Sequence, residues 1–203
     1  MTSRKHINLF VRNVPSGAMC SSVIHEWAKD KYDSVTVCYC NENELDTRIH
    51  ELFKLLRLAD SEGANPCIYR EIIIIDMWPS KQSFNKLKLL ENTHTMVFSP
   101  RLSSSDMVCH IAKKHLGFFR SKWVYGYRSM YDVIHNQFDN RMDWKVLKDF
   151  LLLRGAEELE HLITAYVHDL KPPLSFDSCD MIDYYYSVFV RRNEHDSNQA
   201  ECL

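Results

Sequence analysis

A run of four isoleucines, Ile72 to Ile75, constrains the fold more than any other stretch of this 203-residue chain. The run has no polar alternation, so both of its faces must be covered, as in a central strand of a mostly parallel sheet. It ends at Asp76, shortly before the turn residues Pro79 and Ser80. Ligands bind at the carboxyl ends of central strands in open α/β sheets. Asp76 is therefore a candidate binding residue; the alternative is that it only caps the next helix or holds the turn.

Strands alternate with helices on both sides of the isoleucine run. Residues 6–11, 34–40 and 93–98 are further predicted strands, and amphipathic helical patterns follow the strands. This alternation predicts an α/β fold with a doubly wound, mostly parallel sheet of about five strands and helices on both faces. The helices predicted within this part cover residues 18–32, 45–60, 80–91 and 103–116, the last of them stopping at Gly117.

The pattern changes after Trp123, where helical spacing continues without a further strong strand. Residues 182–190 are either a last helix or an edge strand. We expect an α/β domain over residues 1–170, closing helices included, and a C-terminal extension over residues 171–203 whose last residues fray. The helices predicted in the closing part cover residues 131–138, 144–153 and 156–167.

The composition bounds the class of protein and its location. A hydrophobic fraction of 45% and a charged fraction of 26% are ordinary for a soluble globular protein. The net charge of -2 gives no overall attraction to nucleic acid or to an anionic membrane, so a phosphate would have to bind at a local basic cluster. No stretch approaches the roughly 20 apolar residues that span a bilayer, and no membrane partner is expected.

The cysteines predict a reducing compartment. There are 7 cysteines, an odd number, and none shows the repeated C-x-x-C spacing of a zinc site. The amino terminus carries no apolar signal segment, so we expect a cytoplasmic protein. Cys38 and Cys40 share one face of a predicted strand, where packing is their expected role.

The order of elements and the residues at the strand ends resemble the amino-terminal domain of the DHH phosphoesterase family, especially its short-oligonucleotide exonuclease branch. Leu9 to Gly17 resembles a family segment of the form Phe-Thr-His-Asn-Asp-Leu-Asp-Gly, and Ile75-Asp76 resembles the next metal-binding strand end. Residues 37–46 and 129–132 carry the rest of the likeness. The resemblance implies hydrolysis of phosphodiesters in small nucleotides and short nucleic acids, with two manganese ions held by Asp and His.

Most of those metal ligands are replaced in this chain. When this chain is aligned with the family segment that it resembles, Arg12 takes the place of a His, and Val14 and Ser16 take the places of two Asp residues. Ser99-Pro100-Arg101 stands where the Asp-His-His motif is expected. The chain is therefore similar to a pseudoenzyme of the family, without a metal cofactor.

Two aspartates, Asp76 and Asp132, remain from the ligand set. A two-metal site needs several carboxylates and imidazoles to hold two dications about 4 Å apart. Manganese would therefore bind only if the site were rearranged, as in an active phosphodiesterase that uses both aspartates with His94 or His135. This rearranged enzyme is one functional alternative.

The main hypothesis is a metal-free cleft that binds or sequesters a nucleotide, or a short or cyclic oligonucleotide. Arg12 and Arg101 would stand at the ends of two strands that converge, and guanidinium groups bind phosphate in a bidentate manner. Ser16, Gly17 and the helical turn after them would add backbone N–H groups aimed at the anion. Sequestration of a signalling nucleotide would suit a small viral or mobile-element protein.

Two alternatives to phosphate binding stay open. In the first, the arginines form internal ion pairs with Asp76 and Asp132, because orphaned carboxylates in a cleft need partners. In the second, the fold is a protein-interaction scaffold, an inhibitor or adaptor. Its residues 184–192, with three tyrosines and two arginines, would dock on a partner protein or in a homodimer.

Overall fold

The computed structural model describes residues 4–61, 68–90, 92–99, 116–120, 130–138, 141–161, 163–164 and 182–188. Its centre is a five-stranded sheet with the order β2-β1-β3-β4-β5, and every pairing is parallel. The prediction of an α/β fold with a mostly parallel sheet is confirmed. The strands are β1 (Arg4–Arg12), β2 (Ser34–Cys40), β3 (Ile68–Ile75), β4 (Thr93–Ser99) and β5 (Leu116–Arg120).

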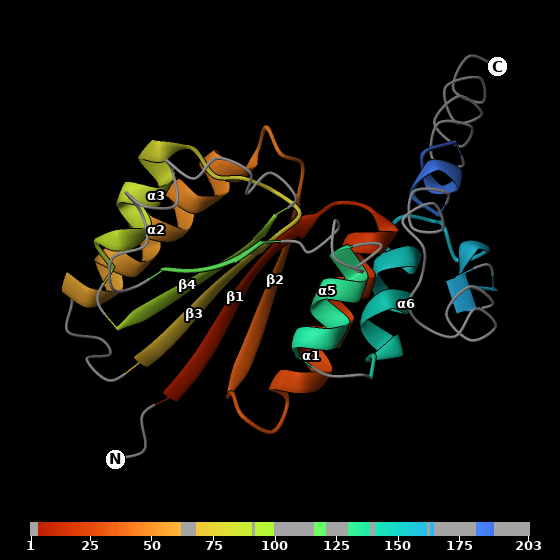
Figure 1. Ribbon diagram of the computed structural model, residues 1–203, viewed down its shortest axis with the longest axis horizontal. Coiled ribbons are helices and arrows are strands. Elements are labelled where there is room, and N and C mark those ends of the chain that lie inside the picture. Colours follow the sequence, from red (N-terminus) through yellow and green to blue (C-terminus); the bar gives the residue numbers. More distant parts are fainter. Residues whose placement is uncertain are drawn as a thin grey trace, which may run out of the picture.

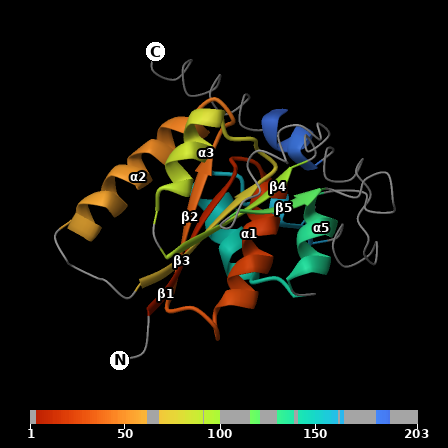
Figure 2. The same ribbon diagram turned by 60° about the vertical axis from the view of Figure 1, so that its left-hand side comes forward.

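Helices cover both faces of the sheet (Figure 1), and a second view shows the same two layers (Figure 2). α2 and α3 lie on one face, while α1, α5 and α6 lie on the other. None of the described helices is long and apolar enough to cross a membrane. The helices are α1 (Pro15–Ala28), α2 (Leu45–Ser61), α3 (Lys81–Lys88), α5 (Met130–Gln137) and α6 (Trp144–Leu152).

The isoleucine run supplies both cores, as its sequence predicts. Ile73 and Ile75 belong to the core under α1, and Ile72 and Ile74 belong to the core under α2 and α3. All four side chains are fully buried, and each such burial stabilises the fold by about 1.5–3 kcal/mol. The central position of β3 follows from this two-sided burial.

The strand order creates a topological switch point between β1 and β3. The chain leaves β1 toward β2 on one side, and then crosses back over β1 to form β3 on the other side. The carboxyl ends of β1 and β3 are therefore the place where a doubly wound sheet offers a crevice for a ligand. Arg12 is the last residue of β1, and Asp76 follows the last residue of β3.

The predicted start of the first helix is wrong. α1 begins at Pro15 instead of residue 18, because proline fits the first position of a helix without losing a hydrogen bond. Ser16 and Gly17 therefore lie in the first helical turn and not in a loop. A Cβ atom at Gly17 would collide with the carbonyl oxygen of Arg12, so this helix approaches its strand as closely as only glycine allows.

The later elements agree with the sequence except at one strand. α5 and α6 confirm two predicted helices, and residues 159–161 and 163–164 are also helical. Gly117 lies in β5 opposite Met96 and does not end a helix; the predicted helix before it falls on residues outside the described part. Residues 182–188 are helical, so the edge-strand alternative is wrong.

Candidate functional site

An ion pair joins the two strand ends at the switch point. Arg12 Nη1 donates to Asp76 Oδ2 at 3.0 Å, and the two side chains are 50% and 20% exposed. Burial alone would lower the pKa of Arg12, but the hydrogen bond and charge of Asp76, with the charges of Asp183 and Glu42, raise it. The guanidinium is therefore held charged. The predicted internal pairing is confirmed for this arginine.

The backbone of Asp76 turns its side chain toward that arginine. Asp76 has a φ of 59°, in the left-handed region that Asp tolerates better than most residues. Its backbone N–H donates to the carbonyl oxygen of Phe98 at 2.8 Å, which fixes the turn to β4. Asp76 does not cap α3, because Ser80 is the N-cap and accepts from the backbone N–H of Ser83 at 3.3 Å.

A carboxylate occupies the N-terminus of α1, where an anion was predicted. The backbone N–H of Ser16 donates to Asp183 Oδ1 at 2.9 Å, and Ser16 Oγ donates to Asp183 Oδ2 at 2.6 Å. Burial raises the pKa of Asp183 to about 6, although the Ser16 bonds and the charge of Arg12 act in the opposite direction. The helix of residues 182–188, blue in Figure 1, thus supplies an internal anion to this site.

Arg154 holds the loop between β1 and α1, and the sequence analysis missed it. Its Nε and Nη2 both donate to Asn13 Oδ1, the first at 3.0 Å, and its Nη1 donates to the carbonyl oxygen of Phe150 at 3.2 Å. The guanidinium also lies 3.9 Å from the ring centroid of Phe150 and 5.2 Å from that of Tyr39. The only sequence signal is an arginine before Gly155 at a helix end, where basic residues meet carbonyl groups.

The remaining predicted site residues are not brought to this ion pair in the described part of the structure. Arg101 lies outside the described residues, and Asp132 lies in α5 with its side chain outside them. His94 is the register partner of Glu71 near the amino end of β4, whereas the switch point is at the carboxyl ends of the strands. Among the described residues, no group of three or more His, Cys, Asp or Glu side chains is placed to hold a metal ion.

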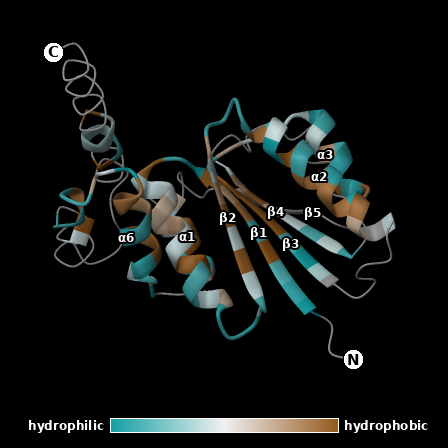
Figure 3. Ribbon diagram, turned by 180° about the vertical axis from the view of Figure 1, so that it is seen from behind, coloured by the Kyte–Doolittle hydropathy of each residue, from teal (hydrophilic) through white to brown (hydrophobic). Residues whose placement is uncertain are grey.

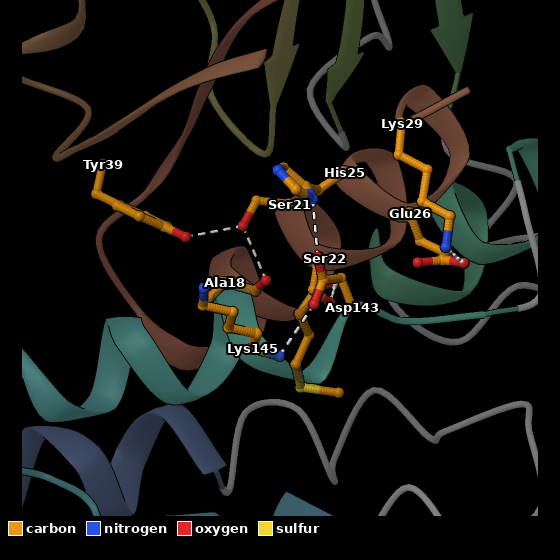
Figure 4. Close-up of polar contacts among 10 residues, drawn as sticks. Ala18, Ser21, Ser22, His25, Glu26, Lys29, Tyr39, Asp143 and Lys145 are labelled. Atoms are coloured by element: carbon orange, nitrogen blue, oxygen red, sulfur yellow. Dashed lines mark hydrogen bonds and ion pairs between the residues drawn. The ribbon is translucent and has the colours of Figure 1, made fainter. Parts of the chain in front are cut away.

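A second polar cluster contains serine, histidine and aspartate side chains but serves as a helix junction (Figure 4). His25 Nδ1 lies 2.9 Å from Asp143 Oδ2, and the backbone N–H of Asp143 donates to the carbonyl oxygen of Ser22. Ser22 Oγ donates to the carbonyl oxygen of Met19, and Ser21 Oγ donates to that of Ala18. Asp143 also caps α6 by accepting from the backbone N–H of Lys145 at 3.0 Å. The cluster therefore ties α1 to the start of α6.

Comparisons with known proteins give distant structural likenesses. No known protein family matches the sequence, and no curated protein matches it. An uncharacterized protein from Helicobacter pylori G27 is similar at 10% identity and a TM-score of 0.42, over 79% of this chain and 44% of that chain. CDC45 from Entamoeba histolytica is similar at 14% identity and a TM-score of 0.42, over 82% of this chain and 34% of that chain. The chain thus spans less than half the length of either structure, and the DHH resemblance stays a prediction.

Proposed function

We propose that this protein is a non-catalytic binder of a phosphate-bearing ligand, a nucleotide or a short or cyclic oligonucleotide, at the switch point and without a metal ion. The observation that carries the proposal is the double hydrogen bond from Ser16 to the carboxylate of Asp183. An N–H group and a hydroxyl in the first turn of a helix are the donors that commonly hold a phosphate. Here the same donors already hold an oxyanion of the protein itself.

The charges around the site imply that the ligand competes with Asp183. The carboxylates of Asp76, Asp183 and Glu42 all act on the charge of Arg12, so carboxylates outnumber the guanidinium group around this arginine in the folded protein. A phosphate would be repelled unless one carboxylate left. Asp183 belongs to a short helix near the C-terminus, and its departure would free the Ser16 donors and reduce the negative charge. The apparent Kd of the ligand is then its intrinsic Kd divided by the fraction of molecules in which Asp183 is not bound to Ser16.

The test is thermal melting with AMP and with a cyclic dinucleotide, each in the presence of a chelator. We expect both wild type and Asp183→Asn to melt at higher temperature with nucleotide, since a ligand that binds the folded state stabilises it. The shift should be larger in Asp183→Asn, because asparagine keeps the shape but not the charge. It should be smaller in Arg12→Ala than in wild type, because this variant lacks the cation of the site.

Arg48→Ala is the matched control, because Arg48 is also half exposed and ion-paired but lies on α2. The absence of a shift in both wild type and Asp183→Asn would overturn the proposal. A shift that appears only with manganese would instead favour the rearranged phosphodiesterase.

A protein-interaction scaffold is the second candidate, and the tyrosines of residues 182–188 favour it. Tyr184 and Tyr185 are 64% and 45% exposed, and their ring centroids lie 6.0 Å apart, whereas Tyr186 packs on Phe150. Exposed neighbouring aromatic rings are enriched at protein interfaces. A concentration-dependent mass in light scattering, lost in the double variant Tyr184→Ser and Tyr185→Ser, would support self-association through this surface.

A further inference from the structure

Sulfur atoms from two separate strands meet at the carboxyl end of the sheet. Cys40 is the last residue of β2, and Met77 follows the last residue of β3 by two positions. β1 lies between these strands, as Figure 3 shows, so their backbones are roughly 10 Å apart, which is twice the spacing of neighbouring strands. Cys40 Sγ nevertheless lies 4.0 Å from Met77 Sδ. The two side chains therefore converge over the end of β1.

A third sulfur belongs to the same group. Cys38 precedes Cys40 by two residues in β2, so both side chains leave the strand on one face, with Cα atoms about 6.6 Å apart. The two thiols are close enough for each to be the largest influence on the pKa of the other: Cys40 lowers that of Cys38 to about 7, and Cys38 raises that of Cys40. Both cysteines are free thiols.

The burial of the three residues differs in a way that suits an ion site. All three belong to the core under α2 and α3. Cys40 and Met77 are each only 1% exposed, whereas Cys38 is partly exposed. Two of the sulfur atoms are thus held in place by packing, and the third connects them to solvent. Because Cys38 is not enclosed, its side chain can change rotamer without repacking the core.

The separation of the two packed sulfur atoms matches a three-coordinate metal ion. With metal–sulfur bonds of about 2.3 Å, two ligands in a trigonal plane lie about 4.0 Å apart. This is the distance between Cys40 Sγ and Met77 Sδ. An ion could therefore enter between them without pushing the two side chains apart.

The donor atoms select the kind of ion. Thiolate and thioether sulfur are soft ligands, which favour Cu(I) over hard cations such as Mg²⁺ and Mn²⁺. Structural zinc sites take four ligands from cysteine, histidine and carboxylate groups. Within the described ranges of the chain, no His, Asp, Glu or further Cys side chain joins the two thiols in a group of three. The described donors are thus two thiols and one thioether.

We propose that Cys38, Cys40 and Met77 form a binding site for Cu(I), with two thiolates and one thioether as ligands. On binding, the thiol protons leave to solvent and two thiolate–copper bonds form. The copper stays in the Cu(I) state, so the step needs no oxidant or reductant. The site goes beyond the proposed function, because it uses neither Ser16 nor Arg12 as a ligand.

The test is an anaerobic titration of the full chain with Cu(I) in competition with bicinchoninate. Its background replaces with serine the cysteines outside the described residues, which are Cys67, Cys109, Cys179 and Cys202. We expect this background to bind one Cu(I) ion per chain. Cys20→Ser is the matched control, because Cys20 is buried in the opposite core, under α1, and its loss should leave the affinity unchanged.

Substitution of each ligand should lower the affinity for Cu(I). Cys38→Ser and Cys40→Ser should each weaken binding at least about a hundredfold, since even the outer contacts of metal ligands are worth about 10–100-fold. Met77→Leu keeps the size of the side chain and removes its sulfur, so it should weaken binding at least about tenfold. One equivalent of Cu(I) should also protect Cys38 from iodoacetamide.

The outcomes separate this site from ordinary packing and from the switch point. An affinity that ignores Cys38→Ser and Cys40→Ser, or one that ignores Met77→Leu, would overturn the three-sulfur site. Nitrogen or oxygen neighbours of copper in X-ray absorption would overturn it too. Copper binding that persists in Asp183→Asn, whatever that variant does with nucleotide, would show that the two sites stand or fall separately. Melting each variant without copper separates lost binding from lost folding.

Discussion

Ser16 and Asp183 are 167 residues apart in the sequence and share two hydrogen bonds, of 2.9 and 2.6 Å, at the N-terminus of α1. This contact joins the C-terminal helix to the switch point of the sheet. Ile182 and Tyr186, from the same helix, are buried in the core under α1. The division into a domain over residues 1–170 and an extension over residues 171–203 stays a prediction, but the described part of the extension packs on the domain.

The ionisation of Asp183 should make the protein less stable above pH 6 than below pH 4. Its pKa is raised from 3.8 to about 6 in the folded state, so folding favours the protonated carboxyl. This stability is fully present below the unfolded pKa, and it is lost as the pH rises through the folded pKa. The loss is on the order of 2–3 kcal/mol.

Urea unfolding of wild type and Asp183→Asn between pH 4 and pH 7.5 measures this loss. We expect the two proteins to be similarly stable at pH 4 and the variant to be the more stable at pH 7.5. A difference in the free energy of unfolding that does not vary with pH would contradict the prediction.

Substitutions at Asp76, whose backbone is left-handed, should separate the effects of charge and of backbone strain on the free energy of unfolding. Asp76→Asn keeps a residue that tolerates a φ of 59° and removes the charge that pairs with the half-exposed Arg12, so it should cost less than about 1 kcal/mol. Asp76→Ala adds about 1–2 kcal/mol of left-handed strain. Asp76→Gly should fall nearer to Asn than to Ala. Equal free energies of unfolding for Asn and Ala would show that strain at this turn is negligible.

Gly17→Ala should destabilise the protein by about 1–3 kcal/mol, because the new methyl group overlaps the carbonyl oxygen of Arg12 and must push α1 away from β1. Gly155→Ala is the control. Gly155 has a φ of 59° but nothing within 4 Å of the added Cβ, so its cost is backbone strain alone. We expect the Gly17 variant also to weaken nucleotide binding at Ser16, whereas the Gly155 variant should not. Unfolding curves and melting shifts with AMP check both statements.

Cys38 should be the thiol in β2 that reacts first at neutral pH. The neighbouring thiol of Cys40, with help from the charge of Arg48 and against the effect of burial, lowers the pKa of Cys38 to about 7. Cys38 is partly exposed, whereas Cys40 and Cys20 are buried. Mass spectrometry after brief iodoacetamide treatment at pH 7.5 should find Cys38 modified well before Cys20 and Cys40. Faster labelling of Cys40 would refute the assignment.

The sequence anticipated part of the site because part of it is local. Asp76 was found from the end of an apolar strand, and its pairing with Arg12 follows from two parallel strands that end side by side. The predicted helix start at residue 18 is wrong, because Pro15 fits the first helical position and starts the helix three residues earlier. The carboxylate that fills the α1 N-terminus was missed, since nothing near Ser16 in the sequence indicates it.

The sequence analysis also missed a polar row at the amino end of the sheet, formed by His6, Ser34 and Arg70. His6, Ser34 and Arg70 come from three separate strands, and each looks like an ordinary residue at a strand start. Only the register of a parallel sheet places them in one row. Residues such as these have no common spacing in the sequence.

The sequence by itself determined the class of fold and the central strand, because burial on two faces requires an apolar residue at every position of that strand. It also determined the apolar stripe of each amphipathic helix, since apolar residues at helical spacing lie on the one face that is buried. The tertiary structure alone decided which distant groups meet: Asp183 with Ser16, Arg154 with Asn13, and His6 with Arg70. Such contacts depend on how whole elements pack and on strand register, and local periodicity carries no information about either.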